Sequence, residues 1–339
     1  MSTINDIANA TGVSCSTVSR VLNGSERISK ETTRKVMEMA IKLDYKHNWH
    51  SEIARMDKHV IGIVASSPIS NLFYFPIWRS IFEMADMLGY GIEFYRTDGT
   101  NGIRSNTDII RTLEEHADGI LYVGNFFFSK EELKILGELK CPIVSVFGNI
   151  DIPNVIHVKT NNHKAAYEAT NYLIKLGHTK IAHIMAQRSF DQANERKEGY
   201  VKALEDNNLP VNENLIAVGD LYYSQAYKCS LDLIDSGNEF SAVFCFNDEC
   251  AAAFIRAAKD RNWKVPDDIS IVGFDDVLCD NDISKDIPLI TTMRQPRRDM
   301  ATYAFNSLLN RIRGIDVPIE KVFNPILIER FSTAPFRVI

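Results

Sequence analysis

Near its start the chain reads TINDIANATGVSCSTVSRVLN (residues 3–23), and this stretch decides how the first part of the protein folds. Thr3 can cap a first helix, with Asp6 three positions later as its partner in a capping box. Gly12 stands where a chain leaving a helix needs a positive φ, and Ser14 can cap a second helix. Apolar residues recur at helical spacing, namely Ile4, Ile7, Ala8, Val13, Val18, Val21 and Leu22. The pattern predicts a helix-turn-helix.

The side of the second helix that faces away from this apolar stripe is small and polar. It carries one arginine, Arg20, which can bond O6 and N7 of a guanine together. Such a face fits the major groove of DNA, and the alternative is an ordinary helical hairpin with a solvated polar face. The predicted DNA-contacting residues are Thr3, Ser14, Cys15, Ser16, Thr17, Ser19, Arg20, Asn23 and Arg27.

The composition is that of a soluble globular protein, with 45% hydrophobic and 24% charged residues in a chain of 339. This length gives room for two or three domains. We expect no membrane segment, because no apolar run is long enough, and a cytoplasmic location, because the polar start is unlike a signal peptide. The six cysteines include no CxxC pair, so we expect reduced thiols, no metal site and no cofactor.

Charge is distributed unevenly along the chain. The net charge is −6, which by itself argues against a nucleic-acid partner. Residues 1–59, however, carry a net charge of +2, and the remaining residues carry −8. A basic head on an acidic body suits a protein in which the head alone contacts phosphate groups.

From His59 onward, short continuous apolar runs alternate with helical patterns, which is typical of parallel sheets buried on both faces. The expected strands are Val60–Ala65, Ile92–Tyr95, Gly119–Val123 and Ile143–Phe147, then Ile181–Met185, Leu215–Val218, Ala242–Phe246 and Ile269–Phe274. We therefore predict an all-α helix-turn-helix headpiece (residues 1–45), a linker (46–58), and an α/β core (59–339) of two Rossmann-like halves with parallel sheets.

Polar and aromatic residues follow the ends of these strands, where open α/β sheets bind ligands. Aromatic walls together with carboxylate, amide and guanidinium groups suit a neutral polyol such as a sugar. The alternative is that these residues are helix caps or core. The predicted effector-binding residues are Tyr74, Phe75, Asn125, Arg196, Asn247 and Asp275.

Several ordered motifs resemble the LacI/GalR family of lac repressor-like regulators. They are VSCSTVSRVLNG (Val13–Gly24), Ile28–Thr32, Leu176–His178, Arg196–Gly199, Phe246–Asp248, Val272–Asp276 and Thr291–Pro296. The resemblance implies a periplasmic-binding-protein-like core whose halves, about 59–160 plus 293–322 and about 161–290 plus 325–339, are joined by three crossings. It implies a homodimer on a pseudo-palindromic operator. Arg196, Asn247 and Asp275 match positions that contact the effector in the family.

In relatives the linker forms a hinge helix whose leucine wedges into the minor groove. Here the agreement is weaker. Ala54 stands at the wedge position, with Ile53 and Met56 as bulkier neighbours, and His47 replaces the usual proline. Either Ile53 or Met56 serves as the wedge, or the protein bends DNA less.

These features predict a repressor of a carbohydrate-utilisation operon, controlled allosterically by a small sugar, a galactoside being one candidate. A regulator corepressed by a non-sugar metabolite and a sugar-binding receptor without DNA function are the alternatives. An enzyme is disfavoured, because the chain has no GxGxxG, P-loop or GxSxG motif.

Overall fold

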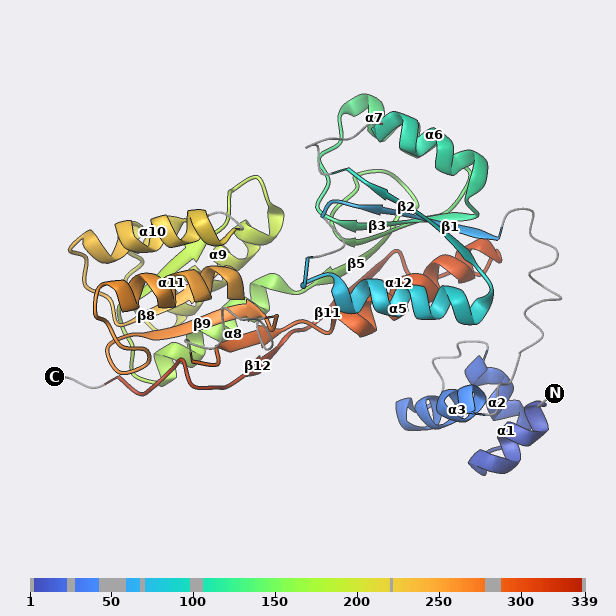
Figure 1. Cartoon of the computed structure of the whole chain (residues 1–339), viewed down its shortest axis with the longest axis horizontal. Coiled ribbons are helices and arrows are strands. Elements are labelled where there is room, and N and C mark those ends of the chain that lie inside the picture. Colours follow the sequence, from blue (N-terminus) through green and yellow to red (C-terminus); the bar gives the residue numbers. More distant parts are fainter. Residues whose placement is uncertain are drawn as a thin grey trace.

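The computed structural model describes residues 3–22, 28–42, 59–67, 71–97, 106–219, 222–277 and 288–336. Three helices form the headpiece, namely α1 (Ile4–Thr11), α2 (Cys15–Leu22) and α3 (Lys30–Lys42). Beyond residue 59 the chain forms two α/β halves that lie side by side (Figure 1). Within these described residues no helix has the length and apolar character needed to cross a bilayer.

The turn between α1 and α2 has the predicted caps. Thr3 and Asp6 form a capping box, and hydrogen bonds from Thr3 hold the pKa of Asp6 below its usual value. Gly12 has a φ of 72°, which a Cβ would strain. The three helices bury a shared core of Ile7, Ala8, Val18, Val21, Leu22, Val36 and Ala40.

The first half is a six-stranded parallel sheet in the order β11-β5-β4-β3-β1-β2. Its strands are β1 (Val60–Ala65), β2 (Gly91–Arg96), β3 (Gly119–Gly124), β4 (Ile143–Phe147), β5 (Ile156–Thr160) and β11 (Glu320–Phe323). Alternate residues of β3 pack against α5 (Phe75–Leu88) and α12 (Arg297–Ile312) on one face and against α6 (Asn106–His116) and α7 (Lys130–Glu138) on the other. The continuous apolar runs are thus buried on both sides.

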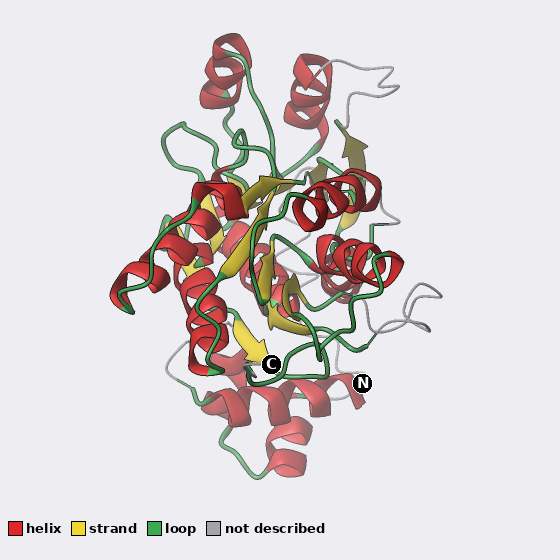
Figure 2. Cartoon of the chain, turned by 90° about the vertical axis from the view of Figure 1, so that its left-hand side faces the viewer, coloured by secondary structure: helices red, strands yellow, loops and turns green. Residues whose placement is uncertain are grey.

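The second half has the sheet order β12-β10-β9-β8-β6-β7. Its strands are β6 (Ile181–Met185), β7 (Ile216–Val218), β8 (Ala242–Cys245), β9 (Ser270–Asp275), β10 (Thr291–Arg294) and β12 (Ile326–Ile328), with η1 (Glu213–Leu215) before β7. All pairs are parallel except β10 with β12. Helix α8 (Asn162–Lys175) packs against α9 (Asp191–Asp206), and α10 (Tyr223–Asp235) packs against α11 (Asp248–Asp260). Figure 2 shows helices around the strands.

The chain crosses between the halves three times. It crosses from β5 to α8, from β10 to α12, and from β11 to β12. All of β10 belongs to the second sheet, so the second crossing comes after Arg294. The boundary expected from the sequence was near 290–293, a few residues earlier. The observed architecture is the fold class that the sequence predicted.

Candidate functional site

The headpiece presents the polar side of α2 to solvent. Cys15, Ser16 and Arg20 are exposed, and Thr17 and Ser19 are partly exposed. The thiol of Cys15 donates a hydrogen bond of 2.9 Å to Asn5 Oδ1 on α1. The apolar residues Val18, Val21 and Leu22 point into the core, so the candidate DNA-contacting residues share the opposite side.

Two of the predicted DNA-contacting residues also stabilise helix ends. The Thr3 hydroxyl accepts a hydrogen bond of 3.3 Å from the Asp6 N–H, and the Ser14 hydroxyl accepts one of 3.1 Å from the Thr17 N–H. Both thus have a structural role whatever they contact on DNA. Asn23 and Arg27, and the candidate hinge residues Ile53, Ala54 and Met56, lie outside the described residues.

Arg196 and Asp275 form a buried ion pair in the second half, next to residues that contact the first half. The crevice is our name for this region, where the sequence predicts the ligand site. Arg196 Nη2 lies 3.8 Å from Asp275 Oδ1, and only 4% and 8% of the two residues are exposed. Burial raises the pKa of Asp275, and Arg196 opposes that rise. Burial lowers the pKa of Arg196 to about 10, so the guanidinium stays charged at neutral pH. A buried ion pair of this kind can bond the hydroxyl groups of a ligand strongly.

The surroundings of Arg196 fix its direction. Its Nε donates to Asn162 Oδ1 at 3.0 Å, and its Nη1 donates to the Phe246 carbonyl. The guanidinium carbon lies 3.5 Å from the centre of the Phe274 ring, which is within range of a cation–π contact. These contacts hold the guanidinium at the carboxyl ends of β8 and β9.

Asp275 and Asp276 have positive φ values of 105° and 58°, a conformation that non-glycine residues rarely adopt. Asp276 is held there by Arg294 and Arg330, at 2.5 and 2.6 Å. Strained backbone of this kind persists only where neighbouring contacts enforce it, often at binding sites. The strained turn directs the Asp275 carboxylate toward Arg196.

Arg297, the first residue of α12, bonds both halves. Its guanidinium donates to the Phe73 carbonyl of the first half at 3.0 Å and to the Asp276 carbonyl of the second half at 2.9 Å. It also lies 5.3 Å from the centre of the Phe73 ring. This contact joins the segment before α5 to the turn that carries Asp275.

Asn247 and Asp248 begin α11. The Asn247 side-chain oxygen accepts a hydrogen bond of 2.8 Å from the Cys250 N–H, so Asn247 caps the helix. Asp248 is buried and accepts hydrogen bonds from the Thr292 hydroxyl (2.6 Å) and the Val277 N–H (2.8 Å). Asn247 is thus the N-cap of α11, and Asp248 is a structural carboxyl group.

The three candidates from the first half lie in different surroundings. Tyr74 is buried in the core, and burial raises its pKa to about 12, while hydrogen bonds to Ser66 and Ser67 oppose this. The charge of Asp275 adds to this rise in the pKa of Tyr74. Phe75 is 57% exposed on the first turn of α5, and among the described residues it has no ring contact with the aromatic cluster around Phe73.

Asn125 contacts Gln192, which the sequence did not indicate as a site residue. Its Oδ1 accepts a hydrogen bond of 2.6 Å from Gln192 Nε2, which also donates to the Phe147 carbonyl at 2.8 Å. Gln192 lies on α9 of the second half, whereas Asn125 and Phe147 follow and end strands of the first. The one sequence signal that could have identified Gln192 as a site residue is its position next to Asp191, where the chain passes from a strand into a helix.

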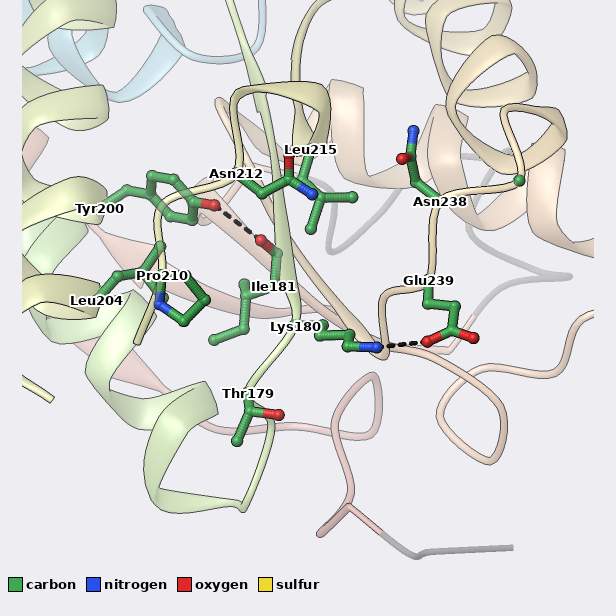
Figure 3. Close-up of a pocket in the computed structure, with 11 residues that line it drawn as sticks. Thr179, Lys180, Ile181, Tyr200, Leu204, Pro210, Asn212, Leu215, Asn238 and Glu239 are labelled. Atoms are coloured by element: carbon green, nitrogen blue, oxygen red, sulfur yellow. Dashed lines mark hydrogen bonds and ion pairs between the residues drawn. The ribbon is translucent and has the colours of Figure 1, made fainter. Parts of the chain in front are cut away.

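A separate cavity of about 290 Å³ lies at the amino ends of β6 and β8 in the second sheet (Figure 3). Its lining includes Thr179, Lys180 and Ile181 before and at the start of β6, and Asn238 and Glu239 before β8. These are amino ends of strands, so the cavity is distinct from the crevice of Arg196 and Asp275. No cluster of three metal-ligating side chains occurs in the part of the chain that the structure describes.

Comparisons with known proteins agree with this arrangement. Residues 3–48 match "Bacterial regulatory proteins, lacI family", and residues 170–333 match the "Periplasmic binding protein-like domain". The chain is 36% identical to the HTH-type transcriptional regulator RegA of Clostridium acetobutylicum over 97% of its own length and 98% of that protein.

Two solved structures show the same fold along nearly the whole chain. The transcriptional regulator CelR, solved as a complex with cellobiose, is 26% identical in sequence to this chain, with a TM-score of 0.72. The match covers 98% of this chain and 100% of that one. The lac repressor, solved as a dimer bound to operator and the anti-inducer ONPF, is 24% identical in sequence to this chain, with a TM-score of 0.69. The match covers 98% of this chain and 99% of that one. The chain belongs to the LacI family of bacterial transcriptional regulators.

Proposed function

We propose that the protein represses a carbohydrate-utilisation operon, binding its operator as a homodimer and releasing it when a small sugar occupies the crevice. The observation that carries this proposal is the buried pair of Arg196 and Asp275 at the boundary of the two halves. A charged donor and a carboxylate acceptor side by side suit vicinal hydroxyl groups. The CelR relative was solved with cellobiose, which supports a sugar as the ligand class.

The DNA-binding part of the proposal is supported by the headpiece. The candidate contacts are Thr3, Ser14, Cys15, Ser16, Thr17, Ser19 and Arg20 among the described residues, with Asn23 and Arg27 beyond them. The related lac repressor was solved as a dimer on its operator. Two headpieces on one dimer would read two half-sites in successive major grooves, so the operator is a pseudo-palindrome. The linker residues Ile53, Ala54 and Met56 are candidates for the minor-groove contact.

The headpiece and the core have separate roles in this proposal. The headpiece (1–45) reads the operator, the linker (46–58) connects it, and the core (59–339) binds the sugar and dimerises. Tyr74, Phe75 and Asn125 are the candidate ligand contacts from the first half, and Arg196, Asn247 and Asp275 those from the second. A ligand that binds the two arrangements of the halves with different affinities shifts their populations and so changes the operator affinity. The proposed role needs no catalysis and no cofactor.

Fluorescence anisotropy with labelled upstream DNA tests the proposal. Specific, salt-dependent binding that a sugar weakens supports an induced repressor. Binding that only a non-sugar metabolite tightens would support the corepressed alternative instead. Absence of any specific site upstream of any gene would overturn the proposal.

A further inference from the structure

The cavity at the amino ends of β6 and β8 has an apolar floor. Ile181, Leu204 and Leu215 line it, and at most 4% of each residue is exposed. Tyr200, from α9, is a further buried lining residue, and its hydroxyl donates a hydrogen bond of 2.8 Å to the Ile181 carbonyl (Figure 3). The hydrogen of this hydroxyl is thus used within the protein. A ligand therefore meets a mainly apolar surface at the bottom of the cavity.

Two opposite charges stand at the rim of the same cavity. Lys180 precedes β6 and Glu239 precedes β8, and their side chains form an ion pair (Figure 3). These side chains are 58% and 81% exposed, in contrast to the buried floor. The hydrogen bond from Lys180 holds the pKa of Glu239 below its usual value, so the carboxylate is charged at neutral pH. Because one charge offsets the other, the rim attracts neither a simple anion nor a simple cation strongly.

Two amides add a donor and an acceptor to the lining. The Asn212 side-chain oxygen accepts a hydrogen bond of 3.0 Å from the Asn214 N–H, so its NH₂ group is the part that can donate to a ligand. The Asn238 NH₂ group donates a hydrogen bond of 2.9 Å to the Ser236 hydroxyl, so its oxygen is the part that can accept from one. The cavity thus offers partners for a negative and for a positive group of one ligand.

A zwitterion fits this arrangement better than an ion of one sign. A carboxylate beside Lys180 and an ammonium group beside Glu239 place four charges in alternating order, so that each has neighbours of opposite sign. An α-amino acid carries both groups on one carbon atom, and its side chain can occupy the floor. A third charge on that floor would lose hydration without gaining a partner, so an apolar side chain is favoured. The volume of about 290 Å³ is near the lower limit for small-molecule sites and suits a ligand of this size.

We propose that this cavity is a second small-molecule site and that it binds an apolar α-amino acid, with leucine, isoleucine, valine and methionine as the candidates. The carboxylate of the ligand contacts Lys180 and Asn212. Its ammonium group contacts Glu239 and Asn238, and its side chain lies on the apolar floor. The site is distinct from the crevice, so this inference does not depend on the ligand class proposed there.

Calorimetry of the full-length protein with single amino acids tests the binding. At least one of leucine, isoleucine, valine and methionine should bind the wild type, whereas glycine, aspartate and lysine should bind at least about tenfold more weakly or not at all. If none of the four apolar amino acids binds, the cavity is an ordinary solvent-filled hollow and the proposal is wrong. Equal affinities for glycine and leucine would overturn the role of the floor.

Substitutions at the rim test whether the amino acid occupies this cavity. Lys180→Gln and Glu239→Gln each remove one charge, and the fold should tolerate both because exposed ion pairs contribute little to stability. Each should weaken binding of the apolar amino acid about tenfold. Lys202→Gln breaks the exposed ion pair with Asp206, outside the cavity, and is the matched control with unchanged affinity. Wild-type affinity in both rim variants would mean that the amino acid binds elsewhere.

Two analogues of leucine test which charge each group contacts. Isocaproate lacks the ammonium group and isoamylamine lacks the carboxylate, so each should bind the wild type at least about tenfold more weakly than leucine. Glu239→Gln should not weaken isocaproate further, and Lys180→Gln should not weaken isoamylamine further. The opposite pattern would contradict the assigned contacts.

The Asp275→Asn variant separates this cavity from the crevice. Asp275 ends β9, whereas the cavity lies at the amino ends of β6 and β8, and these strands run parallel. Binding of the apolar amino acid should therefore be the same in Asp275→Asn as in the wild type. Binding that Asp275→Asn abolishes and the rim variants leave unchanged would place the amino acid in the crevice and overturn this inference. A crevice that binds no sugar would overturn the proposed function and leave this inference intact.

Discussion

Gln295 donates a hydrogen bond of 2.7 Å to the buried carboxylate of Asp275, and the Thr160 hydroxyl donates to the oxygen of the same Gln295 amide. Gln295 directly precedes the crossing into α12, and Thr160 directly precedes the crossing into α8. One side chain therefore connects the crevice carboxylate to two of the three crossings. A ligand that contacts Asp275 can bias the arrangement of the halves through this connection.

Replacing Gln295 by leucine should weaken the coupling between the crevice and DNA. Asp275 and Thr160 each lose a buried partner, so we expect the free energy of unfolding to fall by about 1–3 kcal/mol. Urea denaturation measures that loss, and operator binding at increasing sugar concentrations measures the coupling. Gln225→Leu, the same substitution at an exposed position of α10, is the control. An unchanged sugar response in Gln295→Leu would show that the connection does not transmit the signal.

The Arg20→Ala variant should bind the operator less tightly and less selectively. Arg20 is the exposed arginine of α2, and one bidentate contact to guanine contributes about 1–3 kcal/mol of discrimination. Anisotropy titrations against operators changed at single base pairs would locate the position whose preference relaxes. Equal weakening on all sequences would mean that Arg20 contacts phosphate rather than a base.

Gly273 should tolerate no side chain. A Cβ at this residue of β9 would lie 2.2 Å from Asp248 Oδ1 and 3.1 Å from Ile290 Cγ2. Because both neighbours are packed in the core, we expect Gly273→Ala to cost about 1–3 kcal/mol. Gly137→Ala in α7 is the matched control, since nothing lies within 4 Å of its Cβ, and it should stabilise the protein by about 0.5–1 kcal/mol. Equal effects of the two substitutions in thermal unfolding would contradict this explanation.

Asp248 should make the free energy of unfolding depend on pH. Burial, with Asp275 nearby, raises the pKa of Asp248 to about 7, whereas an unfolded aspartate titrates near about 3.9. Between these values the folded protein holds a proton that the unfolded chain has lost. The free energy of unfolding therefore falls as the pH rises from about 4 to 7, by up to about 1.4 kcal/mol per unit.

The Asp248→Asn variant should lack this fall. The comparison of the two proteins at each pH also cancels His183, whose pKa burial lowers to about 4 and which acts in the opposite direction. Denaturant titrations between pH 4.5 and 7.5 give the difference. A difference that does not change with pH would contradict a raised pKa at Asp248.

The sequence predicted the features that depend on local pattern. The capping residues Thr3 and Ser14, the positive φ of Gly12 and the continuous apolar strands are all properties of neighbours in the chain. Strand β5 was missed, because its sequence IHVKT alternates buried and half-buried positions instead of forming an apolar run. The three crossings came from the family resemblance, since no local pattern encodes which sheet a strand joins.

The crevice was predictable only in part. Strand ends indicated Arg196 and Asp275, which the structure brings together. The partners Gln192 and Gln295 were not indicated, because their contacts join residues 67 and 135 positions away in the chain. Phe75 follows the same strand-end rule as Tyr74, yet one helix position moves its side chain from the core to the surface.

We propose that the carboxylate of Asp275 converts sugar binding into release of DNA. Asp275→Asn removes the charge that faces Arg196 but keeps the size of the side chain. The decisive measurement is operator affinity by anisotropy, with and without the sugar that binds the wild type. If Asp275 has this role, the Asp275→Asn variant binds the operator with nearly unchanged affinity and does not respond to the sugar. A variant that still binds the sugar in calorimetry and still releases the operator would contradict it.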